Sequence, residues 1–194
     1  MLKLYDTEIC IFRLSPFLSA ALTEKPFTTL WPLLGRQDYP AIEVWVVAAV
    51  PAHSALNVPV DGMDIHLVPT DVALARSRAA NKALSLARGE FALILDDDDW
   101  IAPDHISTLV KALKATPGFD VAYSRTQAVD QDLVAENMPL MGLPFDAMRL
   151  LAGNWMPLHS VLFSIRLRDL GCRFDEQLDL YEDWDFWLQA AQQT

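Results

Sequence analysis

Four consecutive aspartates, at residues 96–99, form a dense group of side chains that could bind a metal ion or take part in catalysis. They directly follow the apolar run of residues 91–95, which is typical of a buried β-strand. Adjacent carboxylates repel one another unless a cation offsets their charge. Carboxylate oxygens without a neighbouring His or Cys favour Mg²⁺ or Mn²⁺ over zinc, and these ions commonly bridge to nucleotide phosphates. The alternative is a solvated acidic turn before the next helix, but the position after an apolar strand favours a metal site.

A second set of acids, near the end of the printed sequence, is interleaved with large aromatic residues. It comprises the runs FDE at residues 174–176 and YEDWDFW at residues 181–187. Burial beside aromatic rings raises the pKa of a carboxylate, which suits a general base that takes a proton from a hydroxyl near neutral pH. Asp183 or Glu182 is the candidate for that role. The alternative is an amphipathic helix with aromatic residues in the core and acids in its first turn, and both interpretations can hold together.

Apolar runs that alternate with helical patterns must position both sets of acids. This alternation is typical of an α/β fold with a mostly parallel sheet and helices on both faces, whose ligands bind at the carboxyl ends of the strands. The run of residues 126–154 is less regular and is expected to be a surface excursion. We expect strands at residues 8–14, 42–50, 65–69, 91–95, 121–123 and 161–163, and helices at residues 27–35, from Thr70 or Asp71 to Leu86, from Pro103 to about Pro117, and over the last acidic run.

Composition limits the class of protein. The 194 residues are 52% hydrophobic, enough for one core, so we expect a single domain spanning residues 1–194. A net charge of −11 opposes binding to nucleic acid or to an anionic membrane surface. No apolar run reaches the ~18 to 20 residues of a transmembrane segment. Cys10 and Cys172 lie far apart without zinc-site spacing, so we expect both thiols to be reduced. We therefore expect a cytoplasmic protein, which could be peripheral at the inner face of the membrane.

Several short runs together resemble the family 2 glycosyltransferases. ARSR at 75–78, ARGEF at 87–91 and LDDDDW at 95–100 look like the central block of that family, and FDE at 174–176 with EDWD at 182–185 resembles its acceptor-side acidic motif. The order and separation of the two blocks also match. The resemblance implies a GT-A-like α/β sandwich that moves a sugar, with inversion, from a nucleoside-diphosphate sugar to an acceptor hydroxyl.

The resemblance also implies a role for individual residues. Asp98 would be the preferred ligand of Mn²⁺ or Mg²⁺, together with Asp96, and Asp96 or Asp97 would lie nearer the ribose or phosphate. Arg76 matches the arginine that helps to hold the nucleotide. Asp183 would be the catalytic base, with the metal stabilising the leaving diphosphate.

The acceptor implied by the resemblance is a glycan, a lipid-linked molecule or another hydroxyl compound. His159, just before the apolar run at 161–163, is a candidate contact for the acceptor or a phosphate, although a lone histidine is more often structural. Trp184 is a further candidate acceptor contact. Trp100 and Trp155 could stack on a sugar ring, but core packing is the more common role of a tryptophan.

Some positions depart from the family pattern. Alanines stand at 48–49, where the family usually has an aspartate that reads the base, so Asp61 or Asp64 would substitute or the base would be held by stacking and backbone contacts. Ser77 stands where an asparagine often follows the motif arginine. Relatives usually continue well beyond the second acidic motif, which suggests that the chain is truncated. These departures favour an alternative function, a non-catalytic module that binds a nucleotide sugar without transferring it.

Overall fold

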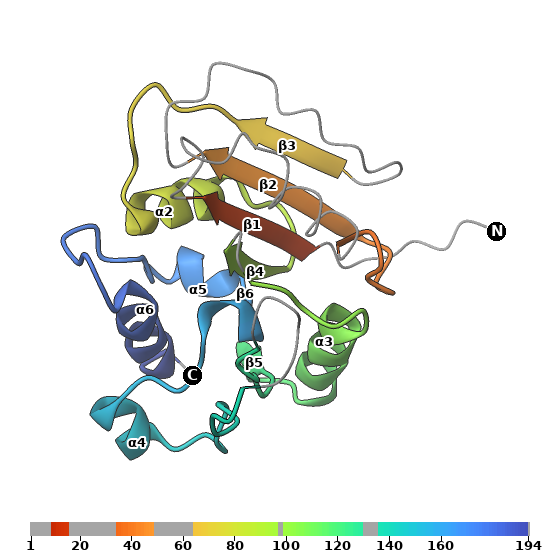
Figure 1. The fold of residues 1–194 in the computed structure, drawn as a ribbon, viewed down its shortest axis with the longest axis vertical. Coiled ribbons are helices and arrows are strands. Elements are labelled where there is room, and N and C mark those ends of the chain that lie inside the picture. Colours follow the sequence, from red (N-terminus) through yellow and green to blue (C-terminus); the bar gives the residue numbers. More distant parts are fainter. Residues whose placement is uncertain (1–8, 16–33, 49–63, 97–98, 130–135, 194) are drawn as a thin grey trace.

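A computed structural model describes residues 9–15, 34–48, 64–96, 99–129 and 136–193, shown in colour in Figure 1. Asp97, Asp98 and Asp61 lie outside the described residues, as does most of the helix expected at 27–35.

One six-stranded sheet organises the fold. Strands β1 to β4 run parallel, with their arrowheads on one side in Figure 1, and β6 is antiparallel to both β4 and β5. The expected mostly parallel sheet is therefore confirmed. The strands, in the sheet order β3-β2-β1-β4-β6-β5, are β1 (Ile9–Ser15), β2 (Ile42–Ala48), β3 (Asp64–Val68), β4 (Phe91–Asp96), β5 (Val121–Tyr123) and β6 (Val161–Ser164).

The order of the strands reverses between β1 and β4. β1 pairs with β2 on one side and with β4 on the other, and Leu14 near the end of β1 is in register with Asp96 at the end of β4. Ligands of open α/β sheets bind outside the carboxyl ends of the strands at such a reversal. The topology therefore places Asp96 where a ligand site is expected.

Five α-helices and a short 3₁₀ helix surround the described part of the sheet. None of these helices has both the length and the apolar character needed to cross a membrane. They are α2 (Arg76–Leu86), α3 (His105–Ala115), α4 (Ala147–Ala152), η1 (Leu158–Ser160), α5 (Arg166–Asp169) and α6 (Glu182–Ala191).

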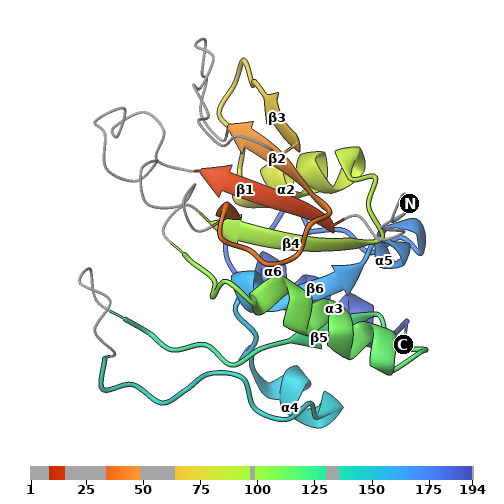
Figure 2. The ribbon, with the colours of Figure 1, turned by 90° about the vertical axis from the view of Figure 1, so that its right-hand side faces the viewer.

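The residues of β4 alternate between two hydrophobic clusters, one on each face of the sheet. Ala92 and Ile94 pack with α2 and α6, whereas Phe91, Leu93 and Leu95 pack with α3. All five side chains are buried. Figure 2 shows α3 lying across one face of the sheet. β4 is thus the central strand that positions Asp96 between two packed layers.

Two sequence expectations need correction. Helix α2 begins at Arg76 and not at a cap formed by Thr70 or Asp71; the residue before it, Ala75, is extended and makes no side-chain cap. The preceding Leu74 packs against the core, so tertiary packing overrides the local capping signal.

Within the excursion at 126–154, the chain forms α4 and a bridge between Thr126 and Met141, so this segment is more regular than expected. Gly142 follows the bridge with φ 100°, and a Cβ there would lie 2.9 Å from the Cα of Arg125. Only glycine fits this close approach.

A side-chain clamp ties α2 to the second acidic run. The amide of Asn81 donates to the carbonyl of Phe174 at 2.8 Å and accepts from its N–H at 3.0 Å. The same amide donates to Glu176 at 3.1 Å, and Arg78 also binds Glu176 at 3.0 Å. One polar residue of α2 therefore fixes the start of a segment that is distant in sequence.

Helix α3 begins with a partly buried histidine. Desolvation by burial is the main cause that lowers the pKa of His105 to about 4. The coulombic interaction with His159 also lowers this pKa, and a backbone hydrogen bond with His159 opposes the shift. The imidazole is therefore neutral in the folded protein at neutral pH.

Replacing Asn81 with alanine removes the clamp and leaves both backbone groups of Phe174 without this partner. We expect the free energy of unfolding to fall by about 1–3 kcal/mol, measured by urea denaturation followed by circular dichroism. Lys82→Ala, at the exposed next position of α2, is the matched control. An Asn81→Ala variant as stable as Lys82→Ala would contradict the role given to the clamp.

The lowered pKa of His105 predicts a loss of stability in acid. Above pH 6.5 the residue is neutral in both states; as the pH falls from about 6.5 towards 4, the unfolded state takes up the proton first, so folding weakens. We expect His105→Gln to retain on the order of 2 kcal/mol more stability than the wild type on going from pH 7 to pH 4. Urea unfolding of both proteins across this range gives the difference; parallel curves would refute the prediction.

Candidate functional site

The two acidic motifs meet at the guanidinium of Arg76. Its Nη2 atom lies 2.5 Å from Oδ2 of Asp96, at the end of β4, and its Nε atom lies 3.2 Å from Oε1 of Glu182, at the start of α6. The side chains of Asp96 and Glu182 are only 14% and 8% exposed, whereas that of Arg76 is 46% exposed. A partly exposed cation thus neutralises two nearly buried carboxylates, which would otherwise be costly to bury.

The position of Arg76 is unfavourable for the helix alone. It is the first residue of α2, Arg78 lies in the same turn, and that turn contains no acid. A helix N-terminus favours negative charge, so two arginines there are a local conflict. Their carboxylate partners on distant elements resolve it, and a local rule broken for a tertiary contact is typical of a functional site.

The first turn of α6 presents a second carboxylate, that of Asp183. Its Oδ2 atom accepts a hydrogen bond from Nδ2 of Asn154 at 2.8 Å, and its Oδ1 atom accepts one from the N–H of Trp184 at 2.7 Å. The preceding residue, Tyr181, has φ 67°, a left-handed conformation that is strained for a non-glycine residue. Two hydrogen bonds and a sharp backbone turn therefore fix the orientation of Asp183.

The run FDE serves the scaffold. Phe174 is buried and stacks on Phe186 with ring centroids 4.5 Å apart. The carboxylate of Asp175 accepts from the N–H of Gln177 at 2.9 Å, which forms a local turn, and Glu176 binds α2. Among the acids of the second motif, the structure thus brings Glu182, with Asp183 beside it in sequence, to the carboxyl edge of the sheet.

His159 contacts the other end of the aspartate run. Its Nδ1 atom lies 2.8 Å from Oδ2 of Asp99, and its side chain is 13% exposed. Both residues line a cavity of about 640 Å³ that reaches from residues 99–105 to residues 124–129. This histidine, which stands isolated in the sequence, therefore contacts the first acidic motif.

The candidate tryptophans differ in their surroundings. The indole N–H of Trp184 donates to the carbonyl of Leu150 at 2.7 Å, and Trp184 and Trp155 are partly buried against the core. Trp100 is 37% exposed and lines the same cavity as His159. Core packing is confirmed for Trp184 and Trp155, and Trp100 keeps an accessible surface.

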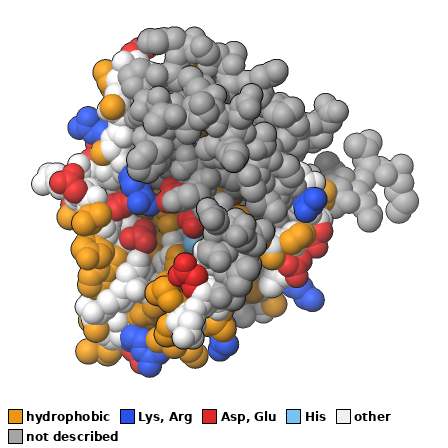
Figure 3. Space-filling view, viewed as in Figure 1, with side chains coloured by type: hydrophobic (Ala, Val, Ile, Leu, Met, Phe, Trp, Pro, Cys, Tyr) orange, Lys and Arg blue, Asp and Glu red, His pale blue; other side chains and the backbone are white. Residues whose placement is uncertain are grey.

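Charged side chains gather on the face shown in Figure 3. Acidic side chains lie near its middle with a basic side chain among them and a histidine beside them, and hydrophobic side chains cover the lower left part. The described part of this face thus carries carboxylates together with a cationic side chain.

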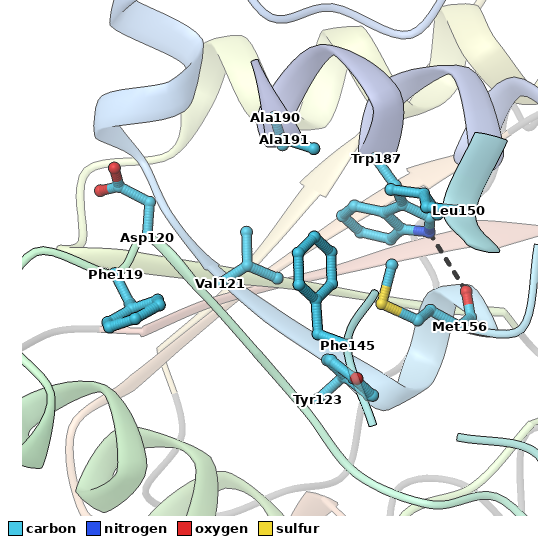
Figure 4. Close-up of a pocket in the computed structure, with 10 residues that line it drawn as sticks. All are labelled: Phe119, Asp120, Val121, Tyr123, Phe145, Leu150, Met156, Trp187, Ala190 and Ala191. Atoms are coloured by element: carbon cyan, nitrogen blue, oxygen red, sulfur yellow. Dashed lines mark hydrogen bonds between the residues drawn. The ribbon is translucent and has the colours of Figure 1, made fainter. Parts of the chain in front are cut away.

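A second cavity, of about 140 Å³, differs in character. It lies between β5 and α6, and its walls are mostly apolar (Figure 4). The carboxylate of Asp120 in its wall is paired with Arg166, and the indole N–H of Trp187 donates to the carbonyl of Met156 at 3.1 Å. Such a wall offers little to a diphosphate, so this cavity is not the candidate site.

A further cluster lies at the opposite, amino edge of the sheet. Glu43, Asp64 and His66 place ligand atoms within 4.8 Å of one another, which is close enough to hold a metal ion. The guanidinium of Arg88, however, lies 2.9 Å from Glu43 and 3.1 Å from His66. An arginine already supplies the positive charge there, so the cluster is structural, and Asp64 is engaged far from the carboxyl edge where it was considered for base recognition.

Comparisons with known proteins point to the glycosyltransferases. The family model of glycosyl transferase family 2 matches residues 30–173, well over half of the chain. An uncharacterized glycosyltransferase of Methanocaldococcus jannaschii is 26% identical over 121 residues, which cover 60% of this chain and 41% of that protein.

Solved structures share the fold. The crystal structure of Staphylococcus aureus TarS 1–349 in complex with UDP has a TM-score of 0.71 at 20% identity and covers 95% of this chain and 55% of its own. The mannosyltransferase PcManGT of Pyrobaculum calidifontis, in complex with GDP-Man and Mn²⁺, has a TM-score of 0.60 at 21% identity and covers 90% and 49%. The chain thus spans about half the length of these proteins, or less, and has their GT-A fold. From the match over most of its length, we conclude that the chain belongs to glycosyl transferase family 2.

Proposed function

We propose that this chain is the donor-binding and catalytic domain of a metal-dependent, inverting glycosyltransferase. The observation that carries the proposal is the bridge of Arg76 between Asp96 and Glu182, because it joins the acidic end of β4 to the helix turn that presents Asp183. The substrates are a nucleoside-diphosphate sugar and an acceptor hydroxyl.

Two relatives support the class of donor. TarS has been solved in complex with UDP-GlcNAc, and PcManGT in complex with GDP-Man and Mn²⁺. Both donors are sugars on a nucleoside diphosphate, although their bases and sugars differ. We therefore assign a nucleoside-diphosphate sugar to this chain and leave its base and sugar open.

The carboxylates at the end of β4 suit a hard divalent cation. Asp96 supplies oxygen atoms at the carboxyl end of the central strand, and Asp97 to Asp99 continue the run. Oxygen ligands of this kind favour Mg²⁺ or Mn²⁺. Asp98, with Asp96, would hold the ion. When bound, the ion would neutralise charge on the leaving diphosphate.

The protein's own residues divide the remaining work. Arg76 holds the nucleotide phosphates by its guanidinium, and Glu182 positions Arg76. Asp183 takes the proton of the acceptor hydroxyl while the oxygen of that hydroxyl forms a bond to the anomeric carbon and the bond from that carbon to the diphosphate breaks. One displacement at the anomeric carbon inverts its configuration. Asn154 orients Asp183 and keeps the carboxylate aimed.

The end of β2 supports an alternative. Ala48 closes that strand, and its methyl side chain cannot form a hydrogen bond to a base. A module that binds a nucleotide sugar without transferring it would tolerate the loss of this hydrogen bond to the base. The assays below separate the two functions, since the module would bind the nucleotide but release no diphosphate.

Replacing Asp183 with asparagine preserves its shape and removes its basicity. We expect kcat to fall by at least about 100-fold, because general base catalysis contributes about 10²–10⁴-fold, with little change in nucleoside-diphosphate affinity. Release of nucleoside diphosphate from a panel of nucleotide sugars with Mn²⁺ measures turnover, and Asp98→Ala should also abolish it. Asp185→Asn, in the same turn but bound to Gln189, is the control. Unchanged turnover in both Asp183→Asn and Asp98→Ala would sink the proposal.

Replacing Arg76 with glutamine tests the bridge. We expect nucleoside-diphosphate affinity, measured by calorimetry with Mn²⁺, to fall by about 10-fold or more because a charge-assisted contact is lost. Without metal, the free energy of unfolding should fall by about 1–3 kcal/mol, since Glu182 stays buried without its partner. Arg78→Gln is the matched control, because it removes a contact of the same kind to the scaffold acid Glu176. Equal affinity in both variants would exclude a role for Arg76 in binding.

A further inference from the structure

A cavity of about 640 Å³ lies beside the end of the aspartate run. Two of its lining residues are close in sequence to residues of the candidate site. Asp99 directly follows the aspartates of the metal motif, and His159 lies in the short segment that begins near Asn154, the partner of Asp183. The residue after the proposed metal ligands thus lines the cavity, together with a histidine that follows the partner of the proposed base in sequence. A ligand bound there would lie next to the end of the metal motif.

The outer wall is a structured part of the chain. Residues 124–129 form it together with Met141, and the backbone of Thr126 exchanges two hydrogen bonds of 3.0 Å with Met141. Gly142 allows the close approach behind this bridge. The cavity is thus bounded by helix α3 on one side and by the bridged segments of Thr126 and Met141 on the other.

Asp99 contacts the imidazole of His159. Its Oδ2 atom lies 2.8 Å from Nδ1, so that nitrogen faces the carboxylate. Among the described residues, none forms a hydrogen bond with Nε2, and the ring lines the cavity. Nε2 is therefore the ring nitrogen that remains for a ligand, and an imidazole nitrogen can form a hydrogen bond with a hydroxyl group.

Charge and aromatic surface narrow the class of ligand. Among the described residues of the lining, the charged ones are two carboxylates, Asp99 and Asp104, and one guanidinium, Arg125. His105, with its pKa lowered to about 4, adds no positive charge at neutral pH. A phosphorylated or acidic ligand would therefore meet more negative than positive charge. The accessible indole of Trp100 offers an apolar face next to hydrogen-bonding groups, a combination that matches a sugar ring.

We propose that this cavity binds the acceptor as an uncharged carbohydrate, with Nε2 of His159 forming a hydrogen bond with one of its hydroxyls and Trp100 packing on a ring face. This inference rests on the proposed function, because it names the acceptor class for the same site. It also assigns Asp99, which follows the proposed metal ligands, to the orientation of His159.

Saturation-transfer difference NMR on the full chain, with Mn²⁺ and UDP or GDP present, tests the inference. The uncharged probes are cellobiose, maltose and N,N′-diacetylchitobiose, and the anionic probes are glycerol 3-phosphate and glucuronate. We expect at least one uncharged disaccharide to bind and both anionic probes to bind more weakly. His159→Ala and Trp100→Ala should each reduce the signal at least fivefold, whereas Lys111→Ala, on the exposed side of α3, should not.

His159→Gln provides a variant that keeps a hydrogen-bond acceptor and should restore part of the signal if His159→Ala does not fold. Preferential binding of the anionic probes, an unchanged signal in His159→Ala and Trp100→Ala, or no binding of any disaccharide while UDP or GDP binds would each overturn the inference. Failure of both nucleotides to bind with Mn²⁺ would instead count against the proposed function, so the two failures are distinguishable.

Discussion

The ion pairs of one arginine hold the candidate site together. Asp96 ends the central strand and Glu182 begins the last helix, and they share the guanidinium of Arg76. Each nearly buried carboxylate would be destabilising without a positive partner. Arg76 starts α2, so this helix, β4 and α6 must keep one relative arrangement for both contacts to form. The Asn81 clamp fixes the same helix to Phe174 and supports that arrangement from the other end of the segment.

Acidic clusters lie at both edges of the sheet, in different surroundings. At the amino edge, Glu43 accepts hydrogen bonds from the backbone N–H groups of Arg88 and Gly89 as well as from the guanidinium of Arg88. That carboxylate is buried, and these donors hold it against the loop before β4. At the carboxyl edge, the acidic run continues beyond Asp96 towards a large cavity. Location at the carboxyl ends of parallel strands, and not acidity alone, makes the latter cluster the candidate ligand site.

The sequence predicted the elements whose signals are local. Continuous apolar runs identified all six strands, and the rule for the carboxyl ends of parallel strands placed Asp96 correctly. The sequence did not predict that α2 starts at Arg76 or that β6 runs antiparallel. It also did not predict that Asn81 and Asn154 form hydrogen bonds to distant segments. The partners of these asparagines lie 93 and 29 positions away, and a single polar residue carries no pattern that identifies such a partner. The run of four aspartates predicted a candidate metal site because the carboxylates are dense in the sequence. The isolated His159 gave a weaker signal, because its surroundings depend on Asp99, which is distant in sequence.

The geometry of Arg76 also bears on how such a site accommodates a ligand. Its contacts use different nitrogen atoms, Nη2 for Asp96 and Nε for Glu182, so one contact can be exchanged without breaking the other. A divalent cation at the aspartates would take over the neutralisation of Asp96, which frees Nη2 for a phosphate while Nε keeps its hold on α6. The site would then bind its donor without rebuilding the turn that carries Asp183, which two hydrogen bonds already orient. Groups held in place before the ligand arrives need no reorganisation at the moment of reaction, and this preorganisation is the physical advantage of tying both acidic motifs to one side chain.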